Sequence, residues 1–286
     1  MPAFPLIRTI LSACAILWLG IIPVSAEHYL VYLIGGQSNA GGRGDASKLT
    51  EPLAAPQKDV RFYWHRSQKS ENGGHVLEDQ WTDLAPGSGH GVTKPVYPKE
   101  FGPEVSFGRA LADAHPKEKI ALIKYTHGGT SLSANWSEKG PMYKTFVATT
   151  QAALGALKAA GHTCELRGMI WQQGENDAAG PAAAAYQANL TNLIARIRKD
   201  LFENKPLPFV IGGLSDSQNP EIKTPGTGWN LVRKAQETVA QTVPKAGFAN
   251  SDGFSTRTGE AIHFSHEGQI ALGKAHAAEM LRLEKP

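Results

Sequence analysis

Short apolar runs alternate along this chain with longer segments in which apolar residues recur every three or four positions. The first run, residues 29–34, is almost continuously apolar and stops at Gly35-Gly36. Strands of this kind suit the middle of a parallel sheet, which is covered on both faces. The pattern predicts five such strands, at residues 29–34, 119–125, 165–171, 207–213 and 246–249.

Helical periodicity fills most of the intervals between these strands. Helices are predicted from Gly102-Pro103-Glu104, over 143–157 with Gly161 beyond, over 186–201, over 229–243, and from about Ser265. The alternation of strand and helix predicts an α/β fold built on one doubly wound parallel sheet. No repeat or linker divides residues 27–286, so we expect a single domain.

Residues 45–100 are the least regular part, with short β-like pieces at 60–64 and 81–84. Aromatic residues are scattered through it, and most such residues anchor loops to a core. The alternative is a loop wall that stacks against sugar rings, to which Trp64, Trp81 or Trp136 could contribute.

The first 26 residues have the pattern of a secretory signal peptide, with Arg8, an apolar core at 10–22 and the small-x-small ending Val24-Ser25-Ala26. The core is shorter than the ~20 residues that span a bilayer. We therefore expect cleavage after Ala26 and a secreted or periplasmic protein, rather than a retained anchor. No later segment is apolar and long enough to cross a membrane.

Charge and cysteine content restrict the possible partners and compartments. The net charge of +3 becomes +2 when Arg8 is removed, which indicates neither a nucleic-acid partner nor a membrane surface. Loss of Cys14 leaves Cys164 without an intrachain partner, so stability must come from a large core. Nothing in the sequence indicates an oligomeric state.

Each of the first three predicted strands ends in a cluster of glycine and polar residues: Gly36-Gln37-Ser38, His127-Gly128-Gly129 and Gln173-Gly174-Glu175-Asn176-Asp177. Strand ends of this kind meet at the edge where open α/β sheets bind ligands. Ser38 is therefore a candidate nucleophile. Gly-Gln-Ser-Asn alone could be an ordinary turn, and it departs from the G-x-S-x-G elbow.

An ester hydrolase needs a nucleophile, a base, an acid that orients the base, and donors for the oxyanion. His263 is a candidate base, and Glu260 is close enough, on a turn, for its carboxylate to reach the imidazole. The candidate oxyanion donors are the backbone N–H groups of Ser38, Gly128 and Gly129 and the amide of Asn176.

The order of these blocks resembles the SGNH hydrolase superfamily. Gly-Gln-Ser-Asn, Gly-Gly-Thr-Ser, Gln-Gly-Glu-Asn-Asp and Glu-x-x-His-Phe are more closely similar to its sialate O-acetylesterase-like branch, which includes the acetylxylan esterases of carbohydrate esterase family 6. Phe101-Gly-Pro-Glu104 also resembles that branch, and the resemblance covers residues 29–281. It implies a three-layer, flavodoxin-like α/β/α sandwich of about five parallel strands. It further implies a serine esterase without metal or other cofactor, acting on O-acetyl groups of carbohydrates.

By block position, the resemblance matches Ser38 to the nucleophile, Gly129 or Gly128 and Asn176 to the oxyanion positions, and His263 to the base. The superfamily usually has aspartate where this chain has Glu260. In some relatives the glutamate at the position of Glu175 has been assigned as the partner of the histidine. Both carboxylates therefore remain candidates, and Glu260 is preferred.

Other polar residues have simpler interpretations. His127 is expected to make a local hydrogen bond and His266 to be exposed. Glu104 is explained by the macrodipole of its helix, and Asp177 by an N-cap or a turn. His263 and His266 lack a metal-ligand pattern, and no phosphate-binding loop follows a strand. The functional alternatives are a carbohydrate-binding protein without turnover and a general short-chain lipase or thioesterase.

Overall fold

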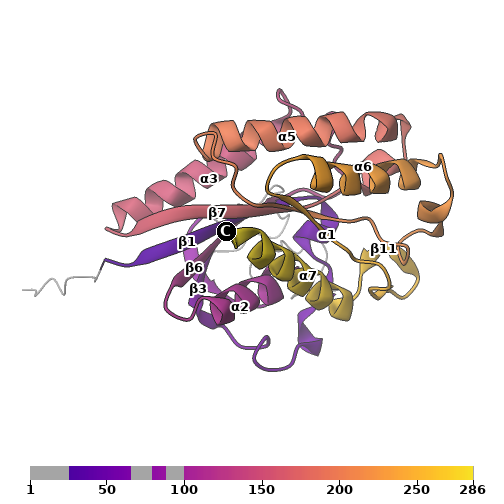
Figure 1. Ribbon diagram of the computed structural model, residues 1–286. Coiled ribbons are helices and arrows are strands. Elements are labelled where there is room, and N and C mark those ends of the chain that lie inside the picture. Colours follow the sequence, from indigo (N-terminus) through magenta and orange to yellow (C-terminus); the bar gives the residue numbers. More distant parts are fainter. Residues whose placement is uncertain (1–25, 66–78, 88–99, 286) are drawn as a thin grey trace, which may run out of the picture.

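A seven-stranded sheet forms the middle layer of the protein, in the order β4-β3-β6-β1-β7-β8-β9. The structure is a computed structural model of the 286-residue chain, and it describes residues 26–65, 79–87 and 100–285. Helices α3, α5 and α6 cover one face of the sheet and α2 and α7 the other (Figure 1). The predicted three-layer α/β sandwich is confirmed.

The sheet is larger than predicted because both β-like pieces of the irregular region join it. β3 runs parallel to β6 and β4 lies antiparallel to β3, so six strands are parallel and the edge strand is reversed. The strands are β1 His28–Gly36, β3 Gln57–Trp64, β4 Trp81–Leu84, β6 Lys119–Thr126, β7 Thr163–Gln172, β8 Phe209–Gly212 and β9 Ala246–Ala249.

The predicted helices are present, together with two helices of four residues at the sheet edge. They are α1 Ser38–Gly41, α2 Glu104–Ala114, α3 Pro141–Ala159, α4 Glu175–Ala178, α5 Tyr186–Leu201, α6 Gly228–Thr242 and α7 His266–Glu284. Ser265 caps α7 by accepting a hydrogen bond from the Gly268 N–H at 3.2 Å. Gly161 follows α3 with a φ of +84°, which is typical of a glycine after a helix.

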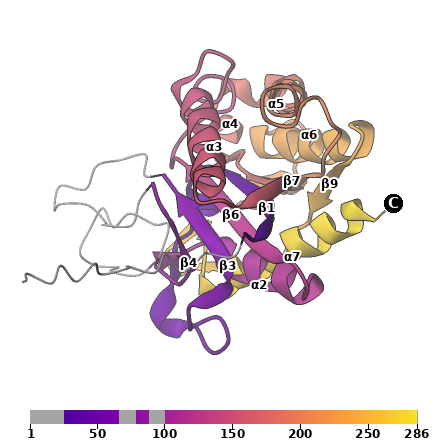
Figure 2. The same cartoon turned by 90° about the vertical axis from the view of Figure 1, so that its left-hand side faces the viewer.

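The central strand β1 explains why the chain has near-continuous apolar runs. Val31 and Leu33 belong to the core under α3, α5 and α6, and Tyr32 and Ile34 belong to the core under α2 and α7. All four side chains have no exposed surface. Figure 2 shows the two helical layers on either side of the strands. Because both faces of β1 are covered, alternate positions cannot be polar.

Two short antiparallel pairs lie outside the main sheet. β2 (Gly44–Asp45) pairs with β5 (Glu100–Phe101), and β10 (Thr256–Arg257) pairs with β11 (Glu260–Phe264). The second pair immediately precedes α7 and carries the predicted base, His263. It is the element that brings the C-terminal part of the chain to the site.

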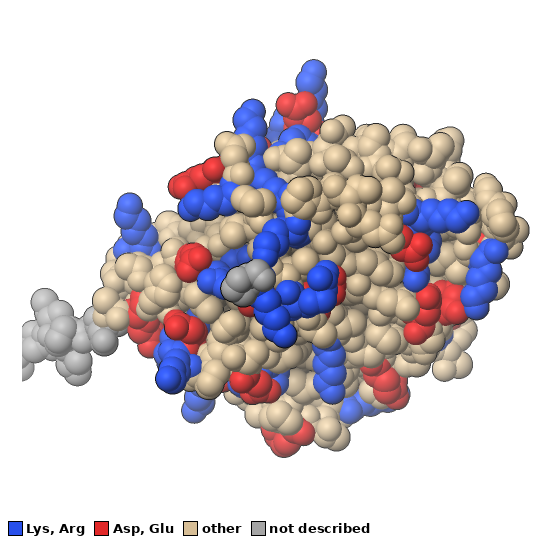
Figure 3. Space-filling view, in the orientation of Figure 1, with Lys and Arg blue, Asp and Glu red and all other residues tan. Residues whose placement is uncertain are grey.

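Positive and negative side chains are interspersed on the face shown in Figure 3, in keeping with the small net charge. In the described part of the chain, every helix is too short or too polar to cross a membrane. The predicted signal peptide lies outside the described residues except for Ala26, and it stays a prediction. The single-domain boundary at residue 27 also stays a prediction.

Candidate active site

Three strand ends lie level with one another at the carboxyl edge of the sheet. Gly36, the last residue of β1, is paired with Thr126 on β6 and with Gln172 on β7. The clusters that follow these strands are therefore neighbours, as the sequence predicted.

A glycine is required where β1 turns into the loop that carries Ser38. Gly36 has a φ of +137°, and a Cβ added there would lie 2.1 Å from the carbonyl oxygen of Gln172. The Gln37 N–H donates to that same oxygen at 3.0 Å, which binds the turn to β7. The turn leaves Ser38 half-buried at the start of α1. Its backbone therefore approaches β7 more closely than any side chain at position 36 would allow.

The loop after β6 passes directly beside Ser38. The His127 N–H donates to the Gly36 carbonyl at 3.1 Å. A Cβ added to Gly128 would lie 3.7 Å from the Ser38 Cβ, so Gly128 is adjacent to the candidate nucleophile. Gly129 has a φ of +68° and is exposed. The ring Nδ1 of His127 lies 3.0 Å from the Gly128 oxygen, in line with the local hydrogen bond expected for it.

The loop after β7 is joined to the Ser38 turn by the side chain of Gln37. Gln37 Oε1 accepts hydrogen bonds from the Asn176 N–H at 3.4 Å and from Gln173 Nε2 at 3.1 Å. Asn176 itself is exposed on α4, at the edge where Ser38 lies. The structure thus brings Ser38, Gly128 and Asn176 to one edge.

The interpretation of Asp177 as an N-cap or turn residue is wrong. Its carboxylate is buried and accepts hydrogen bonds from the Leu132 N–H at 2.8 Å and from Gln173 Nε2 at 2.7 Å. Asp177 therefore joins the loops that follow β6 and β7. The sequence could not reveal this because Leu132 lies 45 residues away.

Glu260 and His263 lie in direct contact on β11. His263 Nδ1 is 2.5 Å from Glu260 Oε1, and the Glu260 side chain is 44% exposed against 15% for His263. They meet on an irregular strand, not on the turn that the sequence suggested. Thr256 pairs with Phe264, and the next residue, Arg257, pairs with Glu260. The paired positions are therefore one residue apart on β10 but four residues apart on β11. Residues 261–263 bulge between these pairs, which allows side chains three residues apart to meet.

Asn39, the residue after Ser38, joins the nucleophile turn to β11. It donates to the Ile262 carbonyl at 3.0 Å and accepts from the Phe264 N–H at 3.1 Å, and these two residues flank His263. Among the described residues, the Ser38 hydroxyl makes no hydrogen bond to His263. Apo enzymes often show long catalytic contacts that tighten when substrate binds. The two side chains are thus held at one edge without a hydrogen bond between them.

Glu175 does not reach His263. It is only 4% exposed, and its Oε1 accepts from Asn39 Nδ2 at 2.6 Å and from Gln218 Nε2 at 3.2 Å. Sequence reasoning missed both Asn39 and Gln218, since an isolated amide carries no sequence signal of a distant partner.

The interpretation of Glu104 through its helix macrodipole is incomplete. Its side chain has no exposed surface, and Oε2 lies 2.7 Å from the Lys124 ammonium. Oε1 accepts from the Gly102 N–H at 2.8 Å, so the helix start supplies only part of its environment. His266 is partly buried instead of fully exposed, with Nε2 2.7 Å from Glu267.

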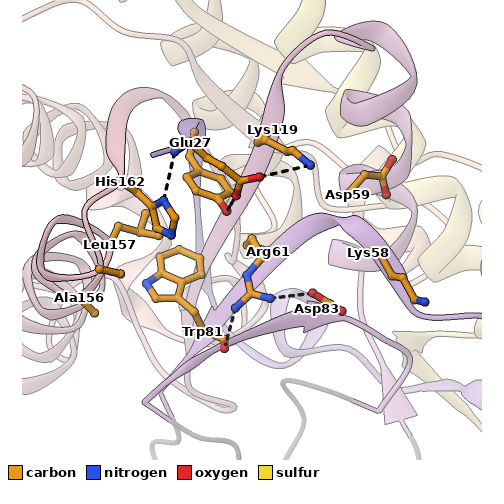
Figure 4. A pocket seen from close by; sticks show the side chains of 12 residues that line it. Glu27, Lys58, Asp59, Arg61, Trp81, Asp83, Lys119, Ala156, Leu157 and His162 are labelled. Atoms are coloured by element: carbon orange, nitrogen blue, oxygen red, sulfur yellow. Dashed lines mark hydrogen bonds and ion pairs between the residues drawn. The ribbon is translucent and has the colours of Figure 1, made fainter. Parts of the chain in front are cut away.

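The aromatic residues Trp64, Trp81 and Trp136 do not form the exposed sugar-binding wall that the sequence suggested. Trp136 has no exposed surface and Trp64 is 7% exposed, so both belong to the core. Trp81 lines a pocket of about 420 Å³ beside the amino-terminal ends of β1, β3 and β6 (Figure 4). Other possible wall residues fall in 66–78 and 88–99, outside the described residues.

The pocket in Figure 4 contains none of the predicted site residues. Its charged side chains are largely paired, since Arg61 lies 2.7 Å from Asp83 and Lys119 lies 3.6 Å from Glu27. In the part of the chain that the structure describes, no three His, Cys, Asp or Glu side chains cluster as metal ligands would. The candidate nucleophile Ser38 lies at the opposite edge of the sheet, at the end of β1.

A family model described as carbohydrate esterase, sialic acid-specific acetylesterase matches residues 28–282. The chain belongs to this family. Its members are carboxylic ester hydrolases, and the family supports O-deacetylation of carbohydrates by this protein. The resemblance to the sialate O-acetylesterase-like branch is thereby confirmed.

Solved structures agree on the fold. A protein from Arabidopsis thaliana is 21% identical, with a TM-score of 0.67 over 90% of this chain and 98% of that one. NanS is 16% identical, with a TM-score of 0.67 over 91% and 98% of the two chains. A carbohydrate acetylesterase from Xanthomonas citri is 20% identical, with a TM-score of 0.59 over 86% and 55%. No protein among the curated sequences matches this chain.

Proposed function

We propose that this protein is an exported serine esterase that removes O-acetyl groups from carbohydrates through an acyl-enzyme intermediate. The observation that carries the proposal is the 2.5 Å contact between His263 and Glu260 on a strand held against the Ser38 turn by Asn39. A histidine with an oriented ring beside a serine at a strand end is the arrangement that nucleophilic acyl transfer requires.

In the first half of the reaction, Ser38 Oγ attacks the acetyl carbonyl carbon while His263 Nε2 takes the hydroxyl proton. Glu260 accepts the Nδ1–H of the ring and stabilises the imidazolium that forms. The tetrahedral oxyanion is bound by the N–H groups of Ser38 and of Gly128 or Gly129, together with the Asn176 amide. The imidazolium then protonates the sugar oxygen, the C–O bond breaks, and the deacetylated sugar leaves.

In the second half, water takes the place of the sugar. His263 removes a proton from the water, which attacks the acetyl-Ser38 carbonyl, and the same oxyanion donors act again. Collapse of this intermediate returns the proton to Ser38 and releases acetate. No step needs a group beyond the side chains named and water.

The substrate we propose is an acetylated xylan or related glycan, or an O-acetylated sialic acid. Family membership supports the carbohydrate class, and the pattern of residues 1–26 supports export. The mature enzyme would begin at Glu27 and meet its substrate in the periplasm or outside the cell.

Acetate release by residues 27–286 tests the proposal. The substrates are acetylated xylo-oligosaccharides and O-acetylated sialic acid, and the control is Ser38→Ala, which removes one half-buried hydroxyl. We expect turnover by the wild type and a loss of several orders of magnitude in the variant, with an unchanged melting temperature. Turnover within about tenfold of wild type in Ser38→Ala would exclude this nucleophile. Binding of acetylated glycans without acetate release would favour a carbohydrate-binding protein.

A further inference from the structure

We propose that Glu175 is a positioning residue that holds His263 in place through the side chains of Asn39 and Gln218, and is not the acid that pairs with the imidazole. This inference rests on the proposed esterase function and deepens it. It assigns different roles to Glu175 and Glu260, the two carboxylates that the sequence left as candidate partners of the histidine.

The first step is the buried network under the site. Glu175 Oε1 accepts two hydrogen bonds, from Asn39 Nδ2 at 2.6 Å and from Gln218 Nε2 at 3.2 Å. Asn39 has no exposed surface, Glu175 is 4% exposed and Gln218 is 6% exposed. Hydrogen bonds to a carboxylate at such depth are stronger and more directional than at the surface.

The second step is where the two amides point. Asn39 Nδ2 and Gln218 Nε2 both donate to the Ile262 carbonyl oxygen, at 3.0 and 2.8 Å. Ile262 immediately precedes His263. The same two amide groups therefore link the Glu175 carboxylate to the backbone of the candidate base.

The third step fixes the orientation of the Asn39 amide. The Phe264 N–H can only donate, so the Asn39 atom 3.1 Å from it must be the oxygen. Its nitrogen then faces the Ile262 carbonyl and needs acceptors there. The Glu175 carboxylate, which can only accept when ionised, supplies the second one. Asn39 thus hydrogen-bonds the Ile262 carbonyl and the Phe264 N–H, on either side of His263. The hydrogen bond to Glu175 holds the Asn39 amide in that orientation.

The fourth step separates Glu175 from the imidazole. Glu260, not Glu175, lies 2.5 Å from His263 Nδ1. The other oxygen of Glu175, Oε2, is buried without a hydrogen-bond partner among the described residues. Among the described residues, Glu175 therefore makes no hydrogen bond to the His263 ring or to Ser38. Its effect reaches His263 through backbone position alone.

Asn39→Asp tests the network because it keeps size and the acceptor for the Phe264 N–H but replaces the donor with a second carboxylate facing Glu175. A displacement of β11 by about 1 Å would lower kcat by about 10²-fold. We expect that loss in kcat, with KM within about twofold, because Asn39 does not touch substrate.

Glu175→Gln keeps an oxygen acceptor, so we expect it to lower kcat by less than about tenfold. The double variant Asn39→Asp/Glu175→Gln removes the repulsion between the two carboxylates. Its kcat should be at least about tenfold higher than the kcat of Asn39→Asp. Glu260→Gln should lower kcat by about 10⁴-fold and shift the acid limb of the pH profile to lower pH. Glu175→Gln should leave that limb in place.

Asn230→Asp is the matched control. Asn230 is 7% exposed and donates to the Ile222 carbonyl at 2.7 Å, and among the described residues it makes no hydrogen bond to Asn39, Glu175 or His263. The same chemical change there should lower the melting temperature without lowering kcat of the folded enzyme. A general loss of stability is thereby separated from displacement of His263.

The proposal is overturned if Glu175→Gln lowers kcat as much as Glu260→Gln and shifts the acid limb equally. It is also overturned if Asn39→Asp gains nothing from Glu175→Gln. Failure of the proposed function looks different, because the wild type would then release no acetate. In that case crystal structures of the wild type and Asn39→Asp decide the inference, since an unmoved β11 in the variant would contradict it.

Discussion

The Lys124 ammonium lies 2.7 Å from the Glu104 carboxylate, and neither side chain has any exposed surface. Lys124 also donates to the carbonyl of Gly41, the last residue of α1, at 2.7 Å. Burial lowers the pKa of Lys124, and the charge of Glu104 opposes that shift. The buried pair thus anchors the last residue of α1, the helix that begins with Ser38.

Removing one partner of this pair should lower the free energy of unfolding more than removing both. Lys124→Met leaves an uncompensated carboxylate in the core, and we expect it to lower the free energy of unfolding by about 3–5 kcal/mol. Lys124→Met/Glu104→Gln should recover most of the loss. Urea unfolding of the three proteins measures this. Equal stability of the single and double variants would contradict it.

Gly36→Ala should disable the site. The added Cβ would lie 2.1 Å from the Gln172 oxygen, so the turn that carries Ser38 must move. A shift of about 1 Å predicts a loss of at least about 10²-fold in kcat. Gly161→Ala is the control, because Gly161 also has a positive φ but meets no atom within 4 Å. It should cost about 1–2 kcal/mol of stability and leave kcat unchanged.

His276 should make the protein less stable in mild acid. Burial lowers the pKa of this fully buried imidazole from 6.5 to about 4, so between these values the unfolded chain binds a proton that the folded chain does not. The contribution of His276 to the free energy of unfolding is therefore fully present above about pH 6.5. It falls by roughly 3 kcal/mol as the pH is lowered towards 4. His276→Leu should lose less stability than the wild type between pH 7.5 and 4.5 in urea titrations. Parallel curves for the two proteins would refute the prediction.

The acyl pocket should accept acetyl groups and little more. Gly128 is adjacent to Ser38 and Asn176 is exposed at the same edge, so an added methylene gains little of the ~0.8 kcal/mol available from full burial. We expect kcat/KM to fall steeply from acetyl to butyryl nitrophenyl esters and to be negligible at octanoyl. A maximum at six or more carbons would point to a lipase-like pocket and away from acetylated glycans.

The sequence predicted those parts of the fold that depend on neighbouring residues. The runs at β1, β6 and β7 are buried on both faces, so their apolar pattern and the glycines after them were sufficient. β3 and β4 were recognised only as β-like pieces, because their region has no regular period. The contact of Glu260 with His263 is also local, although the bulge that permits it could not be inferred from spacing.

What the sequence could not reveal are the polar contacts that join distant segments. Lys124 sits inside an apolar run, and its partner Glu104 lies on another element. Asn39 meets Phe264 across 225 residues, and Gln218 meets Glu175 across 43. Each amide or charge is compatible with many surroundings until the chain is folded, so residue type alone identified none of these pairs.

The hydrogen bond from the Phe264 N–H to Asn39 Oδ1 makes one amide proton a reporter of site assembly. That proton is hydrogen-bonded to the side chain of Asn39, in the turn that follows β1, and not to the β10 backbone. It can exchange with solvent only when the C-terminal hairpin separates from the nucleophile turn. Its exchange rate therefore measures the free energy that joins the two halves of the proposed catalytic centre, in the resting enzyme and without any substrate.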